Sequence, residues 1–537
     1  MIRKLLVANR GEIALRVFRT CRHLGVETVA VVAPDDKGSL HARSSDQTVE
    51  IASYLASEEH IRAARQTGAD AIHPGYGFLA ESPDFAEAVQ AAGLTWVGPP
   101  PDALRAGGDK LEAKRFAREA GVPVVPTGKP GEIGFPLLVK AAAGGGGRGM
   151  RVVRAPEELD ESLEAARREA KAAFGDDRVF CERYVERPRH VEIQLLADAD
   201  GNVLSLGERD CSIQRRHQKV LEESPSPAVG DMLRTAMSDT AVAFAKRIGY
   251  VNAGTAEFMV DRDEFWFLEL NGRIQVEHPV TELVTGIDLV QEQLRIADGA
   301  SLDLRPDRHG HAVEARLYAE DPKTFFPQTG PIETLELPDN VRVDAGVEEG
   351  DEIGLAYDPL IAKLIAHGPT RDDALDRLRD ALRETVVGGV TTNLPFLRWL
   401  VSHPLVRAGD TTTAFLVEHP PLSPSTPHVA PAPWRRPFRL NLPAPAPSSP
   451  PDVDALAADH HGVGGEQSTV TAPMPGTVIR LLVKAGESVR ARQPLVVLEA
   501  MKMETPLTSP YDAVVRAVHV EEGAAVTAGA LLVELEE

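Results

Sequence analysis

Short apolar runs alternate with amphipathic stretches over the first hundred or so residues. Leu5–Ala8 and Val29–Ala33 are apolar enough for buried strands, and Glu12–Leu24 between them repeats its apolar positions at the helical period. This strand–helix–strand order predicts a parallel sheet with crossover helices. The start of the chain is therefore expected to form a βαβ domain.

The middle of the chain shows a different alternation. The apolar runs of 191–206 and 256–270 are each divided by a short turn, at Asp198–Gly201 and Asp261–Asp263. Paired runs of this kind predict antiparallel hairpins. Residues 311–417 mix strands with one helix near Asp372–Val387. We expect α+β domains here.

A glycine run, Gly144–Gly147 with Gly149, lies between the strand-like segments Pro136–Lys140 and Met150–Val153. A dinucleotide fingerprint requires a helix after the glycines, and the chain has no Walker A sequence, so neither type of site is indicated. A glycine loop between antiparallel strands is typical of a flap that closes over phosphates, with Lys140 placed to meet one. The alternative is a flexible turn.

The hairpin of residues 254–271 carries the candidate metal ligands. With a three-residue turn at Arg262–Glu264, Glu257 lies opposite Glu269, and alternation puts Asn271 on the same face. Opposed carboxylates destabilise a sheet unless a cation lies between them, and this ligand set favours Mg²⁺ or Mn²⁺. The alternative is a solvated acidic face. The other face is expected to be apolar, with Phe258, Val260, Trp266, Leu268 and Leu270.

Two clusters indicate anion binding. Arg273, Gln275 and Glu277 follow the hairpin at a spacing of two, and a cation, an amide and a carboxylate so arranged suggest a small anion beside a general base. The segment Glu208–Lys219 concentrates positive charge and predicts a phosphate or anion pocket. A basic loop paired with neighbouring acids is the alternative. Its cationic residues are Arg209, Arg215, Arg216, His217 and Lys219.

Residues 418–469 are predicted to be a linker. The part from 420 to 451 holds 12 prolines in 32 positions, and such a segment cannot bury enough apolar surface to offset its chain entropy. Trp434–Phe438 forms a basic and aromatic island within it. This island either docks on a partner or is a chance aromatic pair.

The last 68 residues contain an internal repeat with an offset of 37. Pro473–Val478 is echoed by Pro510–Val515, and Val483–Val489 by Val520–Val526. Two β units of this length would close one small two-fold sandwich. Lys502 lies between two methionines at the junction of the halves, where we expect a hairpin tip. This position favours a modified lysine over an ordinary surface charge.

Composition excludes several classes of function. The formal net charge is −22, which disfavours general binding to nucleic acid or to anionic membranes. No run of about 18 apolar residues indicates a membrane span, and no signal peptide is expected. The cysteines Cys21, Cys181 and Cys211 lack metal-ligand spacing and suit a reducing compartment. A cytoplasmic protein is therefore expected.

Together the motifs resemble the biotin carboxylase family of ATP-grasp enzymes, fused to a biotin carboxyl carrier domain, as in the α subunit of an acyl-CoA carboxylase. The likeness is carried by Leu6–Ala14, His73–Phe78, Gly144–Met150, Arg189–Gln194, Arg209–Lys219, Arg273–Pro279 and Glu499–Glu504. It implies a multidomain α/β protein. The implied parts are an N-terminal parallel-sheet domain (1–112), an ATP-grasp domain (113–300) with a glycine-rich lid (about 127–205), a C-terminal α+β domain (301–417), the Pro-rich linker (418–469) and an all-β biotinyl sandwich (470–537).

The same resemblance implies a role for each matching residue. ATP phosphates would be bound by Lys110, Lys140, Gly144, Gly145, Gly146, Gly147, Gly149 and Met150. The adenine edge would be Glu182, Arg183 and Val185, and the nucleotide site would be completed by His190, Gln214 and His217. Metal ions would be held by Glu257, Glu269 and Asn271, and bicarbonate by Lys219, Arg273, Gln275 and the Val276 backbone. Glu277 would be the general base, Arg342 would stabilise the biotin enolate, and Lys502 would carry biotin as an amide.

The implied activity is ATP- and bicarbonate-dependent carboxylation of biotin through carboxyphosphate, with Mg²⁺ or Mn²⁺. No carboxyltransferase fits within 537 residues, so a carboxyltransferase β subunit is an expected partner. Biotin protein ligase is another, and a homo- or hetero-oligomer is expected. Two alternatives stay open: a different ATP-grasp ligase with a lipoyl-like appendage, and a non-catalytic carrier or scaffold. The two methionines beside Lys502 favour biotin over lipoate.

Overall fold

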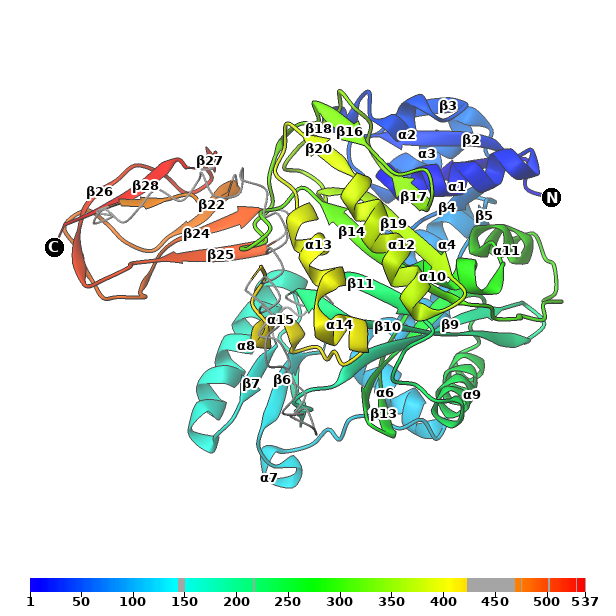
Figure 1. The fold of residues 1–537 in the computed structure, drawn as a ribbon, viewed down its shortest axis with the longest axis horizontal. Helices are drawn as coiled ribbons and strands as arrows, with labels where there is room; N and C mark the ends of the chain where they lie inside the picture. Colours follow the sequence, from blue (N-terminus) through cyan, green and yellow to red (C-terminus); the bar gives the residue numbers. More distant parts are fainter. Residues whose placement is uncertain are drawn as a thin grey trace, which may run out of the picture.

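The computed structural model describes residues 1–142, 150–215, 218–422, 469–474, 476–500, 503–527 and 529–536 (Figure 1). Most of the expected linker, with Trp434–Phe438, lies outside these residues. Within the described part of the chain, no helix is both long enough and apolar enough to cross a bilayer.

The chain begins with a five-stranded parallel sheet of order β3-β2-β1-β4-β5, which confirms the βαβ prediction. Apolar side chains cover both of its faces: Leu6 of β1 packs on one side and Leu5 on the other. The strands are β1 (Lys4–Val7), β2 (Glu27–Val32), β3 (Gln47–Glu50), β4 (Ala71–His73) and β5 (Thr95–Trp96). The helices are α1 (Gly11–Leu24), α2 (Leu40–Arg43), α3 (Ser57–Thr67), α4 (Pro83–Ala91) and α5 (Pro101–Gly108), with η1 at Pro34–Asp36.

The centre of the molecule is one eight-stranded antiparallel sheet of order β13-β12-β9-β10-β11-β14-β19-β17. It joins residues from both expected segments 113–300 and 301–417, because β11 pairs with β14. Its strands are β9 (Arg189–Ala197), β10 (Val203–Arg215), β11 (Gln218–Ser224), β12 (Asn252–Asp261), β13 (Glu264–Asn271), β14 (His311–Tyr318), β17 (Arg342–Ala345) and β19 (Leu360–Gly368).

The two faces of this sheet differ in chemistry. Val191 and Ile193 of β9 pack in one apolar cluster with α9 (Asp231–Arg247). Along β14 and β19 the same face packs on α12 (Arg371–Glu384) and α13 (Leu394–Ser402), drawn in yellow in Figure 1. The opposite face carries buried polar residues and is partly covered by α10 (His278–Thr285). We call this opposite face the polar face.

A smaller three-stranded sheet has the order β7-β6-β8. β6 (Leu137–Ala141) and β7 (Arg151–Val153) pair antiparallel, as predicted for the strands on either side of the glycine run. β8 is Val179–Arg183, and α8 (Leu159–Phe174) packs on this sheet. The remaining elements are α6 (Lys110–Glu119), α7 (Pro130–Ile133), η2 (Pro156–Glu158), α11 (Leu289–Ala297), β15 (Gly330–Pro331), β16 (Thr334–Glu336), β18 (Glu352–Ile353), β20 (Val386–Gly388), α14 (Pro404–Ala408) and α15 (Phe415–Glu418).

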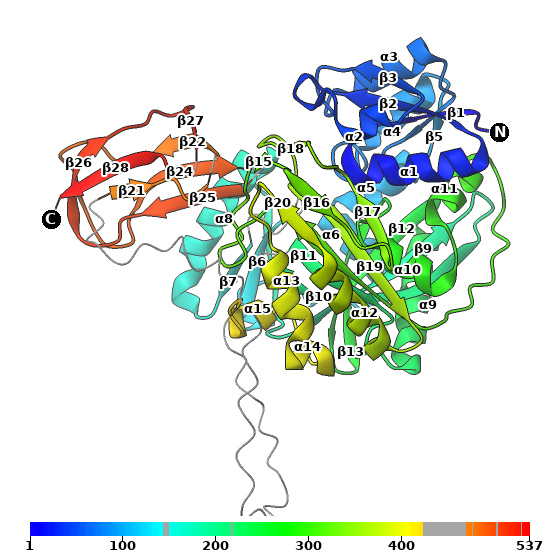
Figure 2. The ribbon, with the colours of Figure 1, turned by 45° about the horizontal axis from the view of Figure 1, so that its top comes forward.

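The described residues between 469 and 536 form two four-stranded sheets, drawn in orange to red in Figures 1 and 2. The offset of 37 is confirmed in three dimensions, because β22, β23 and β24 begin 37 residues before β26, β27 and β28. Buried Val478 and Leu495 repeat as Val515 and Leu532 in the shared core. The strands are β21 (Thr469–Thr471), β22 (Gly476–Leu481), β23 (Ser488–Val489), β24 (Pro494–Ala500), β25 (Met503–Thr508), β26 (Ala513–Val518), β27 (Ala525–Val526) and β28 (Leu531–Glu536).

Candidate active site

A row of charged side chains crosses four neighbouring strands on the polar face. The register sets Glu192 of β9 beside Glu257 of β12, and Glu257 beside Glu269 of β13. Arg209 of β10 lies on the other side of Glu192. Side chains alternate along each strand, so residues in this register share one face. Three adjacent carboxylates in a buried place require cations among them.

Lys219 of β11 supplies the central cation. Its Nζ donates to Glu257 Oε1 at 2.9 Å and to Glu277 Oε1 at 2.6 Å, and it forms a third ion pair with Glu192. Burial alone would lower the pKa of Lys219, but the three carboxylates outweigh it and hold that pKa well above its ordinary value. The ammonium group therefore stays charged and fixes the three acids around one point.

Arg209 is fully buried, and its guanidinium donates hydrogen bonds to the side chains of neighbouring residues. It donates to Glu192 Oε1 at 2.5 Å, to Gln194 Oε1 at 2.6 Å and to Gln275 Oε1 at 2.8 Å. A further bond at 2.9 Å reaches Thr281 of α10. Because these bonds occupy the guanidinium, Arg209 positions its neighbours and is not available to a ligand.

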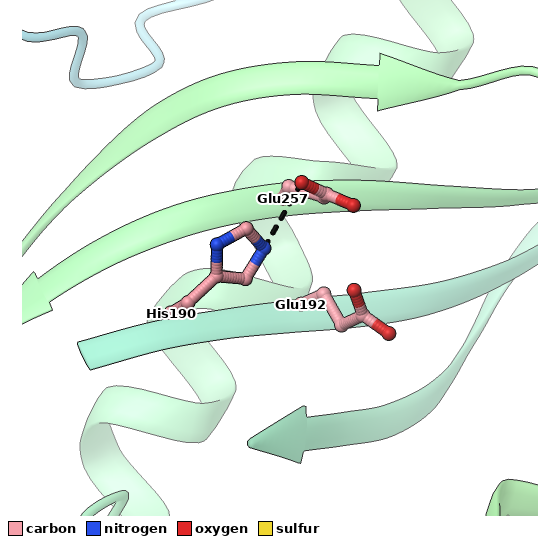
Figure 3. A group of neighbouring side chains, drawn as sticks. All are labelled: His190, Glu192 and Glu257. Carbon is pink, nitrogen blue, oxygen red and sulfur yellow. Dashed lines mark ion pairs between the residues drawn. The ribbon is translucent and has the colours of Figure 1, made fainter. Parts of the chain in front are cut away.

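His190 lies two residues before Glu192 on β9, and Figure 3 shows its ring beside the carboxylate of Glu257. Its Nε2 is 2.9 Å from Glu257 Oε2. Burial lowers the pKa of His190, yet the adjacent Glu257 raises it overall. Burial would conversely raise the pKa of Glu257, but Lys219 and His190 hold it well below its ordinary value. Glu257 is therefore an ionised carboxylate.

The hairpin that carries Glu257 differs from the prediction at its turn. The turn holds only Arg262 and Asp263, so the expected three-residue turn was wrong. A two-residue turn alone would put Glu257 opposite Leu268. A β-bulge at Leu268 adds one residue to β13, and this restores the predicted pairing of Glu257 with Glu269.

The bulge also changes which aromatic side chain faces the core. Phe267 is fully buried in the apolar cluster, whereas Trp266 and Leu268 are half-buried outside that cluster. The prediction was wrong for Trp266 and Leu268, because one extra residue reverses the alternation between the turn and the bulge. It is confirmed for Phe258, Val260 and Leu270.

Two amides complete the surroundings of Glu257. Asn271 Nδ2 donates to Glu257 Oε1 at 2.8 Å, and Gln275 Nε2 donates to the same oxygen at 2.9 Å. Arg273 Nη2 in turn donates to Asn271 Oδ1 at 3.0 Å, and its Nε pairs with Glu81 Oε2 at 3.1 Å. Asn271, Gln275 and Arg273 thus lie in one hydrogen-bonded network with Glu257.

The pair of Glu257 and Glu269 fits a divalent cation. Burial and the adjacent Glu257 raise the pKa of Glu269, because two neighbouring carboxylates oppose each other's ionised form. A cation shared by the two carboxylates would remove this repulsion, and oxygen ligands suit Mg²⁺. Asn271 follows Glu269 by two residues on β13, so its side chain lies on the same face of the sheet.

Glu277 lies just before α10 and is 2 % exposed. Its second oxygen accepts a bond from Arg316 Nη2 of β14 at 3.0 Å. Burial would raise the pKa of Glu277, but Lys219, Arg316 and Arg209 together lower it. The neighbouring Val276 oxygen accepts from Lys363 Nζ of β19 at 2.9 Å, which fixes the loop that carries Glu277.

A second cluster of cations lies at the base of the predicted lid. Lys140 Nζ of β6 donates to Glu182 Oε1 of β8 at 2.9 Å, and Lys114 of α6 pairs with the other oxygen of Glu182. Burial lowers the pKa of Lys110, the first residue of α6, although the nearby Glu269 raises it. Lys110 and Lys140 both lie near enough to Glu269 to oppose the rise of its pKa.

The other residues predicted to bind the nucleotide lie at the ends of β7 and β8 and on β10. Arg183 ends β8 with an exposed side chain, and its backbone N–H donates to the Pro126 oxygen at 2.9 Å. Val185 follows in the next segment, and Met150 directly precedes β7. Gln214 pairs with Lys219 across β10 and β11 and donates to the Cys211 oxygen at 2.8 Å. Several predicted residues lie outside the described residues, namely Gly144, Gly145, Gly146, Gly147, Gly149, Arg216, His217 and Lys502.

Arg342 of β17 lies beside a different feature, a cavity of about 400 Å³. It pairs with Glu282 of α10 at 2.7 Å and with Asp344 at 2.8 Å. Arg16 and Arg19 of α1 line the same cavity. Within the described part of the chain, no ion pair joins Arg342 to Glu277.

Sequence reasoning left several residues of this site unassigned. Glu192 stood within a recognised segment, and its spacing of two from His190 on β9 was an available signal. Arg209 was predicted to belong to an anion pocket, whereas its bonds to Glu192 and Gln275 make it a positioning residue. Lys114 lies four residues after Lys110, one helical turn away on α6. Arg316 and Lys363 come from distant strands, and only the order of strands in the sheet brings them to Glu277.

Comparison with known families covers most of the chain. Residues 1–104 match "Biotin carboxylase, N-terminal domain", and residues 107–305 match "Carbamoyl-phosphate synthase L chain, ATP binding domain". Residues 314–418 match "Biotin carboxylase C-terminal domain", and residues 468–535 match "Biotin-requiring enzyme".

A curated relative matches nearly end to end. The biotin-dependent acyl-coenzyme A carboxylase alpha3 subunit of Mycobacterium leprae is 42% identical over 592 residues, covering 99% of this chain and 98% of that protein. The chain belongs to the biotin carboxylase family. The methylcrotonoyl-CoA carboxylase subunit alpha of Dictyostelium discoideum is 47% identical over 445 residues. This match covers 78% of the chain and 64% of that subunit, so the chain spans under two thirds of that relative.

Solved structures of the family share the fold of the first four fifths of the chain. A 2-oxoglutarate carboxylase biotin carboxylase domain of Hydrogenobacter thermophilus, in complex with MgADP, ADP and bicarbonate, gives a TM-score of 0.76 at 43% identity. It covers 78% of this chain and 98% of that domain. The biotin carboxylase of Campylobacter jejuni gives a TM-score of 0.77 at 39% identity, covering 78% and 99%.

Proposed function

We propose that this chain carboxylates biotin carried on its own C-terminal domain, using ATP and bicarbonate, as the α subunit of an acyl-CoA carboxylase. The observation that carries the proposal is Glu277, a buried carboxylate held ionised between Lys219 and Arg316. It lies on a loop with Gln275 and Arg273, whose donors suit an anion. No ordinary structural role requires so many charges at one buried point.

Bicarbonate is a weak nucleophile, so a base must remove its proton as it attacks ATP. Glu277 takes this proton while the bicarbonate oxygen bonds to the γ-phosphorus and the bond to ADP breaks, which gives carboxyphosphate. Lys219 and Arg273 offset the charge of the anion. A bound anion also competes with Glu277 for the same cations, which makes Glu277 more basic when substrate is present.

The nucleotide is proposed to lie between the lid and the polar face. Lys110 and Lys140 face its phosphates, with the glycine run from 144 to 149 and Met150 above them, and the segment Glu182–Val185 meets the adenine. His190, Gln214 and His217 are proposed to complete the nucleotide site. Mg²⁺ held by Glu257, Glu269 and Asn271 would neutralise charge on the transferred phosphoryl group.

Biotin is proposed to be attached to Lys502. β24 ends at Ala500 and β25 begins at Met503, and these two residues pair with each other. When attached, biotin supplies a ureido nitrogen that accepts the carboxyl group. Arg342, beside its cavity, is proposed to face that ring.

The wider assembly extends the same proposal. A carboxyltransferase β subunit would use the carboxylated carrier, and biotin protein ligase would load Lys502. One relative named above is a methylcrotonoyl-CoA carboxylase subunit and the other is named only for acyl-coenzyme A, so we propose the acyl-CoA class without choosing its member. We also propose an oligomer, a cytoplasmic location and the division into 1–112, 113–300, 301–417, 418–469 and 470–537.

Bicarbonate-dependent release of ADP tests this proposal in the biotinylated full-length chain. Wild type should release ADP only with bicarbonate, and Glu277→Gln should lose at least about a hundredfold in kcat while still binding ATP. Glu264→Gln, at the exposed first residue of β13, makes the same chemical change away from the loop that carries Glu277, and this matched control should keep wild-type activity. Unchanged turnover in E277Q would remove Glu277 from the role of base.

The mass of the intact chain separates the alternatives. One biotinyl group on wild type and none on Lys502→Arg supports the carrier assignment. A lipoyl mass would instead support a ligase with a lipoyl-like carrier. A biotinylated wild type without ATP cleavage would support a scaffold.

A further inference from the structure

Arg316 shares one guanidinium nitrogen between two buried carboxylates. Its Nη2 donates to Glu277 Oε2 at 3.0 Å and forms an ion pair with Glu222 of β11. The side chains of Arg316, Glu222 and Glu277 are 7%, 0% and 3% exposed. Water therefore does little to screen the competition of the two acids for this cation.

The strand register explains how the three groups meet. Glu222 of β11 pairs with Glu314 of β14, and Arg316 follows two residues later on the same face. Lys363 of β19 is in register with Arg316 on the other side. Glu277, on the loop before α10, is the third member of the group and contacts Arg316.

We propose that Arg316 is a positioning residue for the base Glu277, and that Glu222 controls the base by competing for the same guanidinium nitrogen. This inference rests on the proposed function of Glu277. When Glu222 is neutral, Arg316 gives its charge to Glu277 alone and weakens it as a base. When Glu222 is ionised, that charge is divided and Glu277 takes a proton from bicarbonate more readily.

The pH range in which Glu222 affects Glu277 is set by the pKa of Glu222, which burial changes. Although Arg316 opposes it, burial raises the pKa of Glu222 to about 7. Burial also raises the pKa of Glu314 well above its ordinary value, and its carboxylate oxygens have no hydrogen-bond partner among the described residues. The charged or titratable groups facing this pair are Lys219, Cys211, Glu277, Arg316 and Lys363. Glu222 thus changes charge near neutral pH.

Kinetics of the full-length biotinylated chain test the proposal. At saturating ATP and bicarbonate, kcat for ADP release should rise about threefold between about pH 6 and pH 8 in wild type. Glu222→Gln cannot ionise and should lose this rise. Glu314→Gln is the matched control, because it makes the same change on the facing strand, and it should keep the rise. A rise retained in E222Q would overturn the proposal.

Thermal unfolding provides a readout that needs no activity. The folded pKa of Glu222 lies above the unfolded value of about 4.3, so ionisation favours the unfolded chain. The Tm of wild type should therefore fall relative to that of E222Q as pH rises from about 4.5 to 7.5. A Tm difference that does not change with pH overturns the inference even in an active enzyme. An inactive wild type with the expected Tm shift would instead overturn the proposed function.

Discussion

At the scale of single residues, each buried carboxylate around Lys219 is paired with a nearby cationic side chain or with histidine. Lys219 touches three buried carboxylates, Arg209 holds Glu192, and His190 holds Glu257. Burying these charges costs several kcal/mol per ion, and the pairs recover this cost only together. We infer that the arrangement is retained for chemistry, since an apolar core of equal volume would be at least as stable.

Replacing Lys219 by Met should leave Glu192, Glu257 and Glu277 without their shared cation. We expect a loss of about 3–5 kcal/mol in the free energy of unfolding, measured in urea. Lys37→Met is the matched control. Lys37 pairs with Glu50 at 2.8 Å, with both side chains more than half exposed, so this change should cost at most about 1 kcal/mol. Equal losses in the two variants would contradict the account.

His73 makes folding sensitive to acid. Its ring is fully buried at the end of β4, where Nδ1 accepts from the Gly75 N–H at 2.9 Å and Nε2 lies 3.1 Å from Gln293 Oε1. Burial lowers the pKa of His73 to about 4, below the unfolded value of about 6.5. The unfolded chain then binds more protons between these values, so stability falls as pH falls from about 6.5 to 4.

The variant His73→Gln tests whether stability falls with falling pH because of His73. Across that window wild type should lose up to about 1.4 kcal/mol of stability per pH unit from this one group, and H73Q should lose correspondingly less. Thermal unfolding at several pH values measures the difference. Parallel pH profiles for the two proteins would show that the imidazole does not titrate in this way.

At the scale of elements, alternation and helical period were sufficient for much of the fold. The helix near Asp372–Val387 is α12, and the repeat with an offset of 37 is the sandwich. The bulge at Leu268 was not predictable, because an extra residue leaves no mark on local alternation. Arg316 was missed for another reason: its contact with Glu277 depends on the pairing of β11 with β14. Local pattern gives the elements, while the order of strands decides which polar residues meet.

Helix α12 begins at a capping box that should contribute measurably to stability. Thr370 Oγ1 accepts from the Asp373 N–H at 3.2 Å, and Asp373 Oδ2 accepts from the Thr370 N–H at 3.2 Å. Thr370→Ala should cost about 1 kcal/mol in unfolding free energy. Thr235→Ala, at an exposed position inside α9, should stay within about 0.5 kcal/mol of wild type. A neutral T370A would show that water replaces the cap without loss.

At the scale of the whole molecule, buried ion pairs join the N-terminal sheet to the central one. Arg16 of α1 donates to Glu282 of α10 at 2.7 Å and to Asp288 at 2.8 Å. Asp288 also caps α11, so one arginine connects three helices. The N-terminal sheet and the central sheet are therefore expected to unfold in one cooperative transition.

Arg16→Met should destabilise this connection by about 3–5 kcal/mol, because it leaves Glu282 buried next to one cation fewer. Arg19→Met is the control on the same helix. Arg19 pairs with Asp344 at 2.9 Å but is half exposed, and Asp344 keeps its pair with Arg342, so the loss should be about 1 kcal/mol or less. Separate unfolding of the N-terminal sheet in wild type would contradict the expected cooperativity.

Transfer of isotope-labelled carbon from bicarbonate to the protein itself tests the central claim most directly. With ATP and Mg²⁺, the biotinylated full-length chain should acquire label on its C-terminal domain, and both Glu277→Gln and Lys502→Arg should acquire none. Label on K502R, or a fully biotinylated wild type that stays unlabelled while ATP is present, would contradict the account.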